Sequence, residues 1–178
     1  MPKIFDHTHQ RELQYQEISS YLSQHGIYYE NWPVNEAPEE LRHKNSLTAG
    51  EQQALLAAFQ DNLDRLSQQH GYIARDLVVL NEVITENLEE LLHNFERTHH
   101  HTEDEVRFIV DGQGVFTLTR GTDTFSVTVT EGDLISVPAG TEHYFTLTET
   151  RNVKAVRLFQ TKDGWVAIYK EEDTLETR

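Results

Sequence analysis

The sequence contains no cysteine and no long hydrophobic run. Without cysteine it has neither a disulfide framework nor a thiolate metal site, and it fits a reducing compartment. No stretch approaches the ~20 apolar residues that a membrane helix needs, and the first residues lack the apolar segment of a signal peptide. We therefore expect a cytoplasmic protein with no membrane partner.

Basic residues are also scarce, because 15 lysines and arginines face 30 acidic residues, and the formal charge is −15. A chain this acidic repels phosphate backbones, and no basic stripe in the sequence overrides that repulsion. Nucleic acid is therefore not an expected partner. The high like charge on a chain of single-domain length also leads us to expect a monomer.

The expected secondary structure changes from helix to strand near residue 98. Residues 1–98 indicate a mainly helical leader, whereas residues 99–170 hold short β-branched and aromatic runs separated by turn sequences such as DGQG, RGTD and EGD. Many short strands at regular spacing are typical of a small antiparallel barrel or jelly roll. We predict one domain over residues 1–178: a barrel core with the leader packed on its outside and an acidic tail at 171–178.

Two helices of the leader have clear sequence boundaries. Thr48 and Glu51 form a T-x-x-E capping box before an apolar-periodic run, and Gly71 is a natural stop for that run. Residues 88–95 repeat leucine and phenylalanine at helical spacing. The second helix delivers the chain directly to His99, where the most informative residues begin.

Those residues are three histidines and one glutamate that together make a mixed nitrogen and oxygen ligand set: His99, His101, Glu105 and His143. Such a set suits Fe, Ni, Mn or Zn better than Ca or Mg, which prefer oxygen ligands. Side chains two apart on a strand share a face, so His99 and His101 point one way and His100 the other. A closed barrel can bring distant strands to one axis.

The spacing of these residues resembles the two motifs of the cupin superfamily. The first, H-x-H-x3-E-x6-G, begins at His99, and the second, G-x5-P-x-G-x2-H, ends at His143. His93 and Leu147 stand where the superfamily usually has Gly and Asn, although neither position is a ligand position. The competing interpretation is a loop of surface histidines, since the chain has ten histidines. Both motifs in the correct order favour a metal site in a cupin-type jelly-roll barrel.

One family within that superfamily resembles the chain more closely, namely acireductone dioxygenase of the methionine salvage pathway. The similarity lies in FERTHHHTEDEVRFIVDGQGVF, SVPAGTEHYF and RLFQTKDGWVAIY, and it extends to the N-terminal GIYYENW. One family feature is absent, because Thr98 stands where an acidic residue often precedes the first metal histidine.

The resemblance implies one Fe2+ or Ni2+ per chain and a reaction of O2 with 1,2-dihydroxy-5-(methylthio)pent-1-en-3-one. The iron form would give formate and 4-methylthio-2-oxobutanoate. The nickel form would give formate, CO and 3-methylthiopropanoate. The sequence does not say which metal is bound.

Two charged residues beside the ligands are candidates for catalysis. Arg107 shares the parity of Glu105 and carries a permanent positive charge that suits a dianionic substrate, although an ordinary ion pair with Asp104 would also explain it. Asp104 could orient a ligand or support Arg107, or it could be one more solvated acid.

Three aromatic residues are candidates for the substrate-pocket wall: Phe95, Phe145 and Trp165. General core packing is the alternative for each of them, and it is favoured for Phe95, which lies on a helical apolar stripe. Another cupin oxygenase or isomerase, or a non-catalytic metal- or ligand-binding cupin, also stays open, because a fold does not settle a function.

Overall fold

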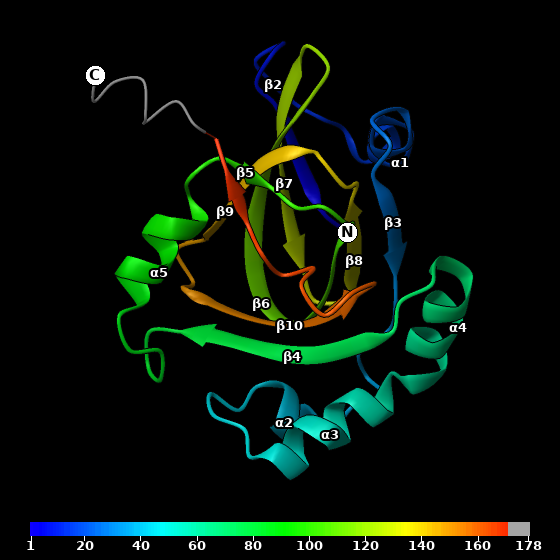
Figure 1. The fold of residues 1–178 in the computed structure, drawn as a ribbon, viewed down its shortest axis with the longest axis vertical. Helices are drawn as coiled ribbons and strands as arrows, with labels where there is room; N and C mark the ends of the chain where they lie inside the picture. The colour runs from blue at the N-terminus through cyan, green and yellow to red at the C-terminus, as the bar shows by residue number, and fades with distance from the viewer. Residues whose placement is uncertain (171–178) are drawn as a thin grey trace.

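The computed structural model describes residues 1–170, in which a twisted antiparallel barrel is flanked by helices (Figure 1). The chain begins with β1 (Lys3–Asp6), β2 (Arg11–Glu12), α1 (Tyr15–Gln24), β3 (Tyr28–Asn31), α2 (Glu39–Arg42), α3 (Ala49–Ala58), α4 (Gln60–His70), β4 (Ala74–Asn81) and α5 (Leu88–Phe95). It continues with β5 (His99–His100), β6 (Glu105–Arg120), β7 (Asp123–Thr130), β8 (Asp133–Val137), β9 (Glu142–Leu147), β10 (Asn152–Phe159) and β11 (Ile168–Tyr169).

The long strand β6 belongs to both faces of the barrel. Its first half pairs with β8 and β10, and its second half pairs with β7 and β9. The sequence predicts two strands here, split at DGQG, but the structure has one continuous strand that bends between the two sheets. Gly112 allows the bend, because its φ is +78° and a Cβ there would overlap the backbone oxygen of Asn152.

A bulge near the bend sets which side chains face inward. The register of β6 against β10 shifts between Lys154 and Ala155, so that Val110 has no partner in the pairing. Before the bulge, odd-numbered residues such as Glu105 and Arg107 face a cavity inside the barrel, and even-numbered residues such as Phe108 face outward under helices. Because side chains alternate along a strand, one face of this half of β6 lines the cavity and the other packs under the helices.

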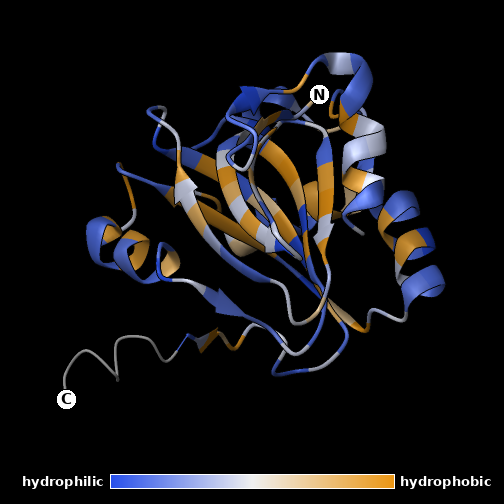
Figure 2. Ribbon diagram, turned by 90° about the horizontal axis from the view of Figure 1, so that it is seen from above, coloured by the Kyte–Doolittle hydropathy of each residue, from blue (hydrophilic) through white to orange (hydrophobic). Residues whose placement is uncertain are grey.

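Helices α3 and α4 cover the outer face of the sheet formed by β4, β10 and the first half of β6. Leu55, Phe59 and Leu63 pack there against Phe108 and Val156, all of them buried. A second core fills the barrel and includes residues of α1 and α5. Figure 2 shows the same division, with hydrophobic segments on the strands inside and mixed helices around them. The predicted mainly β fold with helices packed outside is confirmed.

The N-terminal half contributes more to the barrel than the sequence interpretation allows. β4 pairs with β10 along its whole length, β1 pairs with β7, and β3 pairs with β8. Residue 98 therefore does not mark the edge of the barrel. The run Leu77 to Leu80 was the available signal for β4, because four consecutive apolar residues are typical of a buried strand.

The predicted helix boundaries agree with the structure. Thr48 accepts a hydrogen bond from the Glu51 amide at 3.2 Å and donates its own amide to the Glu51 carboxylate at 3.0 Å, which completes the capping box. Gly71 ends α4 with a left-handed φ of +76°. The helix between them is interrupted at Phe59, so the predicted single helix is two helices, α3 and α4.

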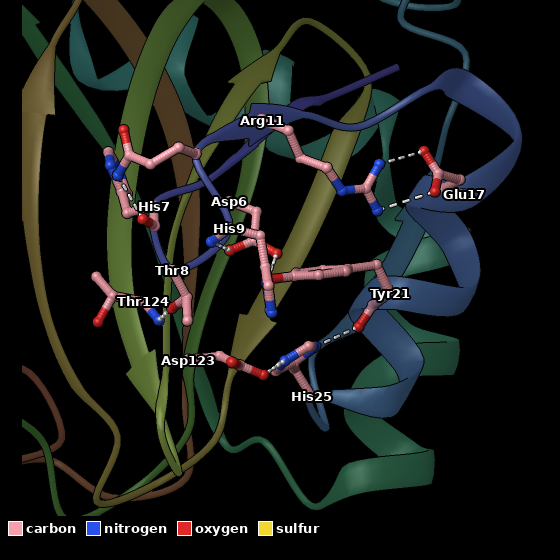
Figure 3. Close-up of polar contacts among 11 residues, drawn as sticks. Asp6, His7, Thr8, His9, Arg11, Glu17, Tyr21, His25, Asp123 and Thr124 are labelled. Carbon is pink, nitrogen blue, oxygen red and sulfur yellow. Dashed lines mark hydrogen bonds and ion pairs between the residues drawn. The ribbon is translucent and has the colours of Figure 1, made fainter.

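Polar contacts fasten α1 to the barrel (Figure 3). The His25 side chain bridges the backbone oxygen of Tyr21 at 2.8 Å and the carboxylate of Asp123 at 2.9 Å. At the other end of α1, Glu17 accepts two hydrogen bonds from Arg11. The His25 contact ties the end of α1 to the start of β7, and the Arg11 contact ties its first turn to β2.

Within residues 1–170 no helix is long and apolar enough to cross a membrane. The predicted acidic tail at 171–178 lies outside the described residues.

Candidate metal centre

Four side chains from three neighbouring strands and the turn between two of them meet inside the barrel. β5 supplies His99, the following turn supplies His101, β6 supplies Glu105, and β9 supplies His143, which is paired directly with His99. One ligand atom of each residue lies within 4.8 Å of all the others. The structure thus brings together all four residues that the sequence assigns to a metal. His100 pairs with Ile168 of β11 and stays out of the group, as its parity predicts.

Backbone carbonyl groups fix the orientation of each imidazole. The Nδ1 atom of His99 lies 2.7 Å from the Arg97 oxygen, that of His101 lies 2.9 Å from the Val166 oxygen, and that of His143 lies 2.8 Å from the Thr141 oxygen. Because a carbonyl only accepts, each Nδ1 carries the proton, and Nε2 is left as a lone-pair donor. Histidines that bind metals are oriented in the same way.

The inward-facing atoms fit a metal ion. Nε2 of His101, Nε2 of His143 and Oε2 of Glu105 are buried without a hydrogen-bond partner in the described residues. Oε2 of Glu105 lies 3.5 Å from Nε2 of His101 and in close contact with Nε2 of His143. Buried polar atoms normally have hydrogen-bond partners, so a group of partnerless ligand atoms aimed at one point fits a cation-binding site. Three imidazoles and one carboxylate are a ligand set that would suit a first-row transition metal.

Arg107 sets the charge balance of the centre. Its Nη2 lies 2.8 Å from Oε1 of Glu105, which leaves Oε2 for the metal position, and its Nη1 donates to the Val106 carbonyl at 3.0 Å. Burial alone would raise the pKa of Glu105, but the charges of Arg107 and His143 outweigh burial and hold that pKa well below its usual range. The carboxylate is therefore ionised and ready to act as a ligand.

The histidines divide into two electrostatic types. Burial lowers the pKa of His99 and of His101, so both rings are neutral near neutral pH. Burial also opposes the charged form of His143, but the adjacent Glu105 carboxylate outweighs burial and raises the pKa of His143. A bound cation would take the place of that proton, since metal ligation requires the neutral ring.

A cavity of about 520 Å³ is lined by three of the four proposed ligands, His99, His101 and Glu105. Phe95, Phe145 and Trp165 all line it, and so does Arg107. Phe95 and Phe145 form an edge-to-face pair with ring centroids 6.4 Å apart, whereas Trp165 is 61% exposed at the margin. A mostly apolar cavity with a few converging polar groups is the usual form of a small-molecule site.

Asp104 takes a different position from the one expected of it. Its Oδ1 accepts a hydrogen bond from the Ala139 amide at 2.9 Å, and within residues 1–170 it does not line the cavity or contact Arg107. Ala139 belongs to the Pro138–Gly140 turn that precedes β9. Asp104 therefore supports the turn that leads to His143, rather than the arginine.

Sequence reasoning missed part of the cavity wall. Arg157 lines it, opposite Arg107 in the β6–β10 pairing, and two hydrogen bonds of 2.8 and 2.6 Å bind Arg157 to Asp76. Val78 and Leu80 of β4 form another part of the wall. Strand alternation in the run KAVRLF could have indicated Arg157, and the apolar run of β4 could have indicated the other two.

A second group of possible ligands lies on the surface, formed by His43, Asp111 and Glu131. Nε2 of His43 lies 3.3 Å from Glu131 and 3.6 Å from Asp111, and Arg42 also pairs with Glu131 at 3.5 Å. His43 and Arg42 contact Glu131, and Asn152 donates a hydrogen bond to Asp111, so these side chains have partners. The surface group differs in this respect from the buried group, whose inward atoms lack hydrogen-bond partners.

The fold and the site define a class of protein, the cupin-type barrels with a buried three-histidine, one-glutamate group able to bind one metal ion. Comparison with known proteins narrows the class to one family. The model of the ARD/ARD′ family matches residues 9–167, and the chain belongs to that family. The family predicted from the sequence motifs is thus confirmed.

Similar proteins share nearly their whole length with this chain. An acireductone dioxygenase from Exiguobacterium sibiricum is 45% identical over 175 residues, which cover 98% of this chain and 97% of the relative. One from Bacillus subtilis is 45% identical over 158 residues, which cover 88% of each. A solved structure of acireductone dioxygenase from Bacillus anthracis, with a cadmium ion in its active centre, superimposes with a TM-score of 0.91 at 41% identity, covering 95% of this chain and 98% of that one.

Proposed function

We propose that this chain is a metal-dependent dioxygenase that cleaves the acireductone 1,2-dihydroxy-5-(methylthio)pent-1-en-3-one with O2. The observation that carries the proposal is the convergence of four ligand atoms beside a mostly apolar cavity, which Arg107 and three of the ligand residues line. The relatives named acireductone dioxygenase support the choice of substrate.

One Fe2+ or Ni2+ per chain is the proposed cofactor, held by His99, His101, Glu105 and His143. The similar solved structure carries cadmium in its active centre, which supports a divalent ion at this position. When bound, the ion supplies a Lewis-acidic centre at which two oxygen atoms of an enediol can be held. All four ligands and the cavity wall come from a single chain, so we propose that the protein acts as a monomer.

The remaining cavity residues bind and orient the substrate in this proposal. Arg107 compensates the negative charge of the acireductone dianion, because its guanidinium lies at the cavity wall beside the ligand Glu105. Phe95 and Phe145 contact the apolar methylthio end. Trp165, at the margin, limits the entry of water.

The decisive experiment loads metal-free protein with Fe2+ or Ni2+ separately and supplies the acireductone under O2. We expect formate and 4-methylthio-2-oxobutanoate from the iron form, and formate, CO and 3-methylthiopropanoate from the nickel form, identified by mass spectrometry. Metal-free protein is the control for non-enzymatic oxidation. If neither metal form exceeds that background, the chain is a binding module or acts on another substrate, and the proposal is wrong.

A further inference from the structure

Glu103 is a buried acid between two of the proposed ligands, yet it takes no part in the ligand group. Its side chain is only 5% exposed. Oε2 accepts a hydrogen bond from the Gln160 amide at 3.1 Å, and Oε1 has no hydrogen-bond partner in the described residues. Burying a carboxylate with so few partners is costly, so a specific packing reason is needed.

The packing partner of Glu103 is Gly164. A Cβ added to Gly164 would overlap Oε1 and the carboxyl carbon of Glu103. Gly164 is buried, and it is not among the glycines of positive φ. Its lack of a side chain is therefore needed for space and not for backbone conformation. The Glu103 carboxylate occupies the volume that a side chain at position 164 would take.

Both contacts of Glu103 are with the segment 160–167, between β10 and β11. The same segment supplies the Val166 carbonyl that holds Nδ1 of His101, and it supplies Trp165 to the cavity wall. Glu103 and His101 lie in the same short turn between β5 and β6. The turn and the segment are thus joined twice, once through His101 and once through Glu103.

We infer that Glu103 is a positioning residue that fastens the segment 160–167 over the metal cavity. Through that segment it fixes the ring of His101 and closes the substrate wall at Trp165. The effect of Glu103 on turnover presupposes the proposed function, whereas its effects on metal affinity and on the segment do not.

Three variants test this role, with a fourth as control. Glu103→Ala removes both contacts, and Gly164→Ala displaces the carboxylate while leaving Glu103 in the chain. Glu103→Gln keeps the size of the side chain and an oxygen that can accept a hydrogen bond from the Gln160 amide. It should therefore retain the metal affinity and the exchange protection of the parent. Asp163→Ala changes an exposed acid of the same segment and serves as the matched control.

Metal affinity is measured by competition with a chelator, and amide hydrogen exchange is followed over residues 160–167. Glu103→Ala and Gly164→Ala should each weaken Ni2+ binding about 10- to 100-fold, the usual effect of removing a group that orients a metal ligand. Both should lose exchange protection at the Gln160 amide and raise KM for the acireductone. Glu103→Gln and Asp163→Ala should stay near the parent values.

The inference is overturned if Glu103→Ala and Gly164→Ala keep the parent's metal affinity and its protection in this segment. It is equally overturned if the segment loosens while metal affinity and KM are unchanged, because Glu103 would then serve only the fold. Should Glu103→Ala fail to fold, Gly164→Ala decides the question alone. A parent protein without dioxygenase activity would refute the proposed function, while metal affinity and amide exchange would still test Glu103.

Discussion

Replacing Arg107 with alanine tests whether turnover needs the positive charge at the cavity wall. The guanidinium lies 2.8 Å from Glu105, one of the proposed ligands, and it lines the cavity itself. For one pair of unit charges at a separation of about 5 Å and an effective dielectric constant of about 20, the interaction is worth about 3 kcal/mol. Loss of that interaction predicts a fall of about 10²-fold in kcat/KM.

The assay is steady-state loss of the acireductone under O2, with metal content determined on the same samples. Arg107→Ala should keep one metal ion per chain, because four ligands remain. Arg107→Lys should recover part of the activity, since it restores the charge but not the planar fork. Arg75→Ala is the matched control, because Arg75 pairs with Asp64 and does not line the cavity.

Two results would refute the reasoning about Arg107. Normal turnover by metal-loaded Arg107→Ala would show that the cavity does not need its charge. Loss of metal from that variant would show that Arg107 acts through Glu105 and not on the substrate.

Three further predictions concern the ligands and the fold. His100→Ala should bind Ni2+ as the parent does, while His101→Ala should bind at least about tenfold more weakly, and equal losses in a chelator competition would contradict the ligand assignment. Lys154→Met should lower the free energy of unfolding in urea by about 2–4 kcal/mol, because the buried ammonium donates to three backbone carbonyls near the end of α2; a loss below about 1 kcal/mol would count against this role. Burial alone would raise the pKa of Asp6, but hydrogen bonds from the His9 side chain and amide outweigh burial and hold that pKa below its usual value (Figure 3). The stability from this carboxylate is present above the pKa of the unfolded chain and is lost as the pH falls through the lowered pKa, so urea unfolding of Asp6→Asn should depend less on pH between about 2 and 5.

Much of the fold was predictable because local patterns agree with it. The capping box at Thr48, the stop at Gly71 and the helix that leads to His99 are each settled by a few adjacent residues. The strand at Ala74–Asn81 was missed, because an apolar run of this length does not say whether it pairs with a distant strand. The single long strand β6 was also missed, because the glycines of DGQG fit a turn between two strands as well as a bend within one strand.

The ligand group was predictable for a related reason. The spacing of the two motifs pointed to the four ligands, and side-chain alternation separated His100 from His99 and put Arg107 on the face of Glu105. The side chains that surround the ligand group could not be predicted. The positions of Asp104, Glu103 and Arg157 depend on partners at Ala139, Gly164 and Asp76, which are 35, 61 and 81 residues away along the chain.

The sequence by itself determined the chemical identity of the site, because residue type and spacing set which donor atoms are available and on which face they lie. Only the tertiary structure decided how those donors are held. The Val166 carbonyl that orients His101, the placement of Arg157 opposite Arg107 and the segment that covers the cavity are brought in by strand pairing and by packing. Such contacts depend on the closure of the barrel, and no local pattern in the chain records them.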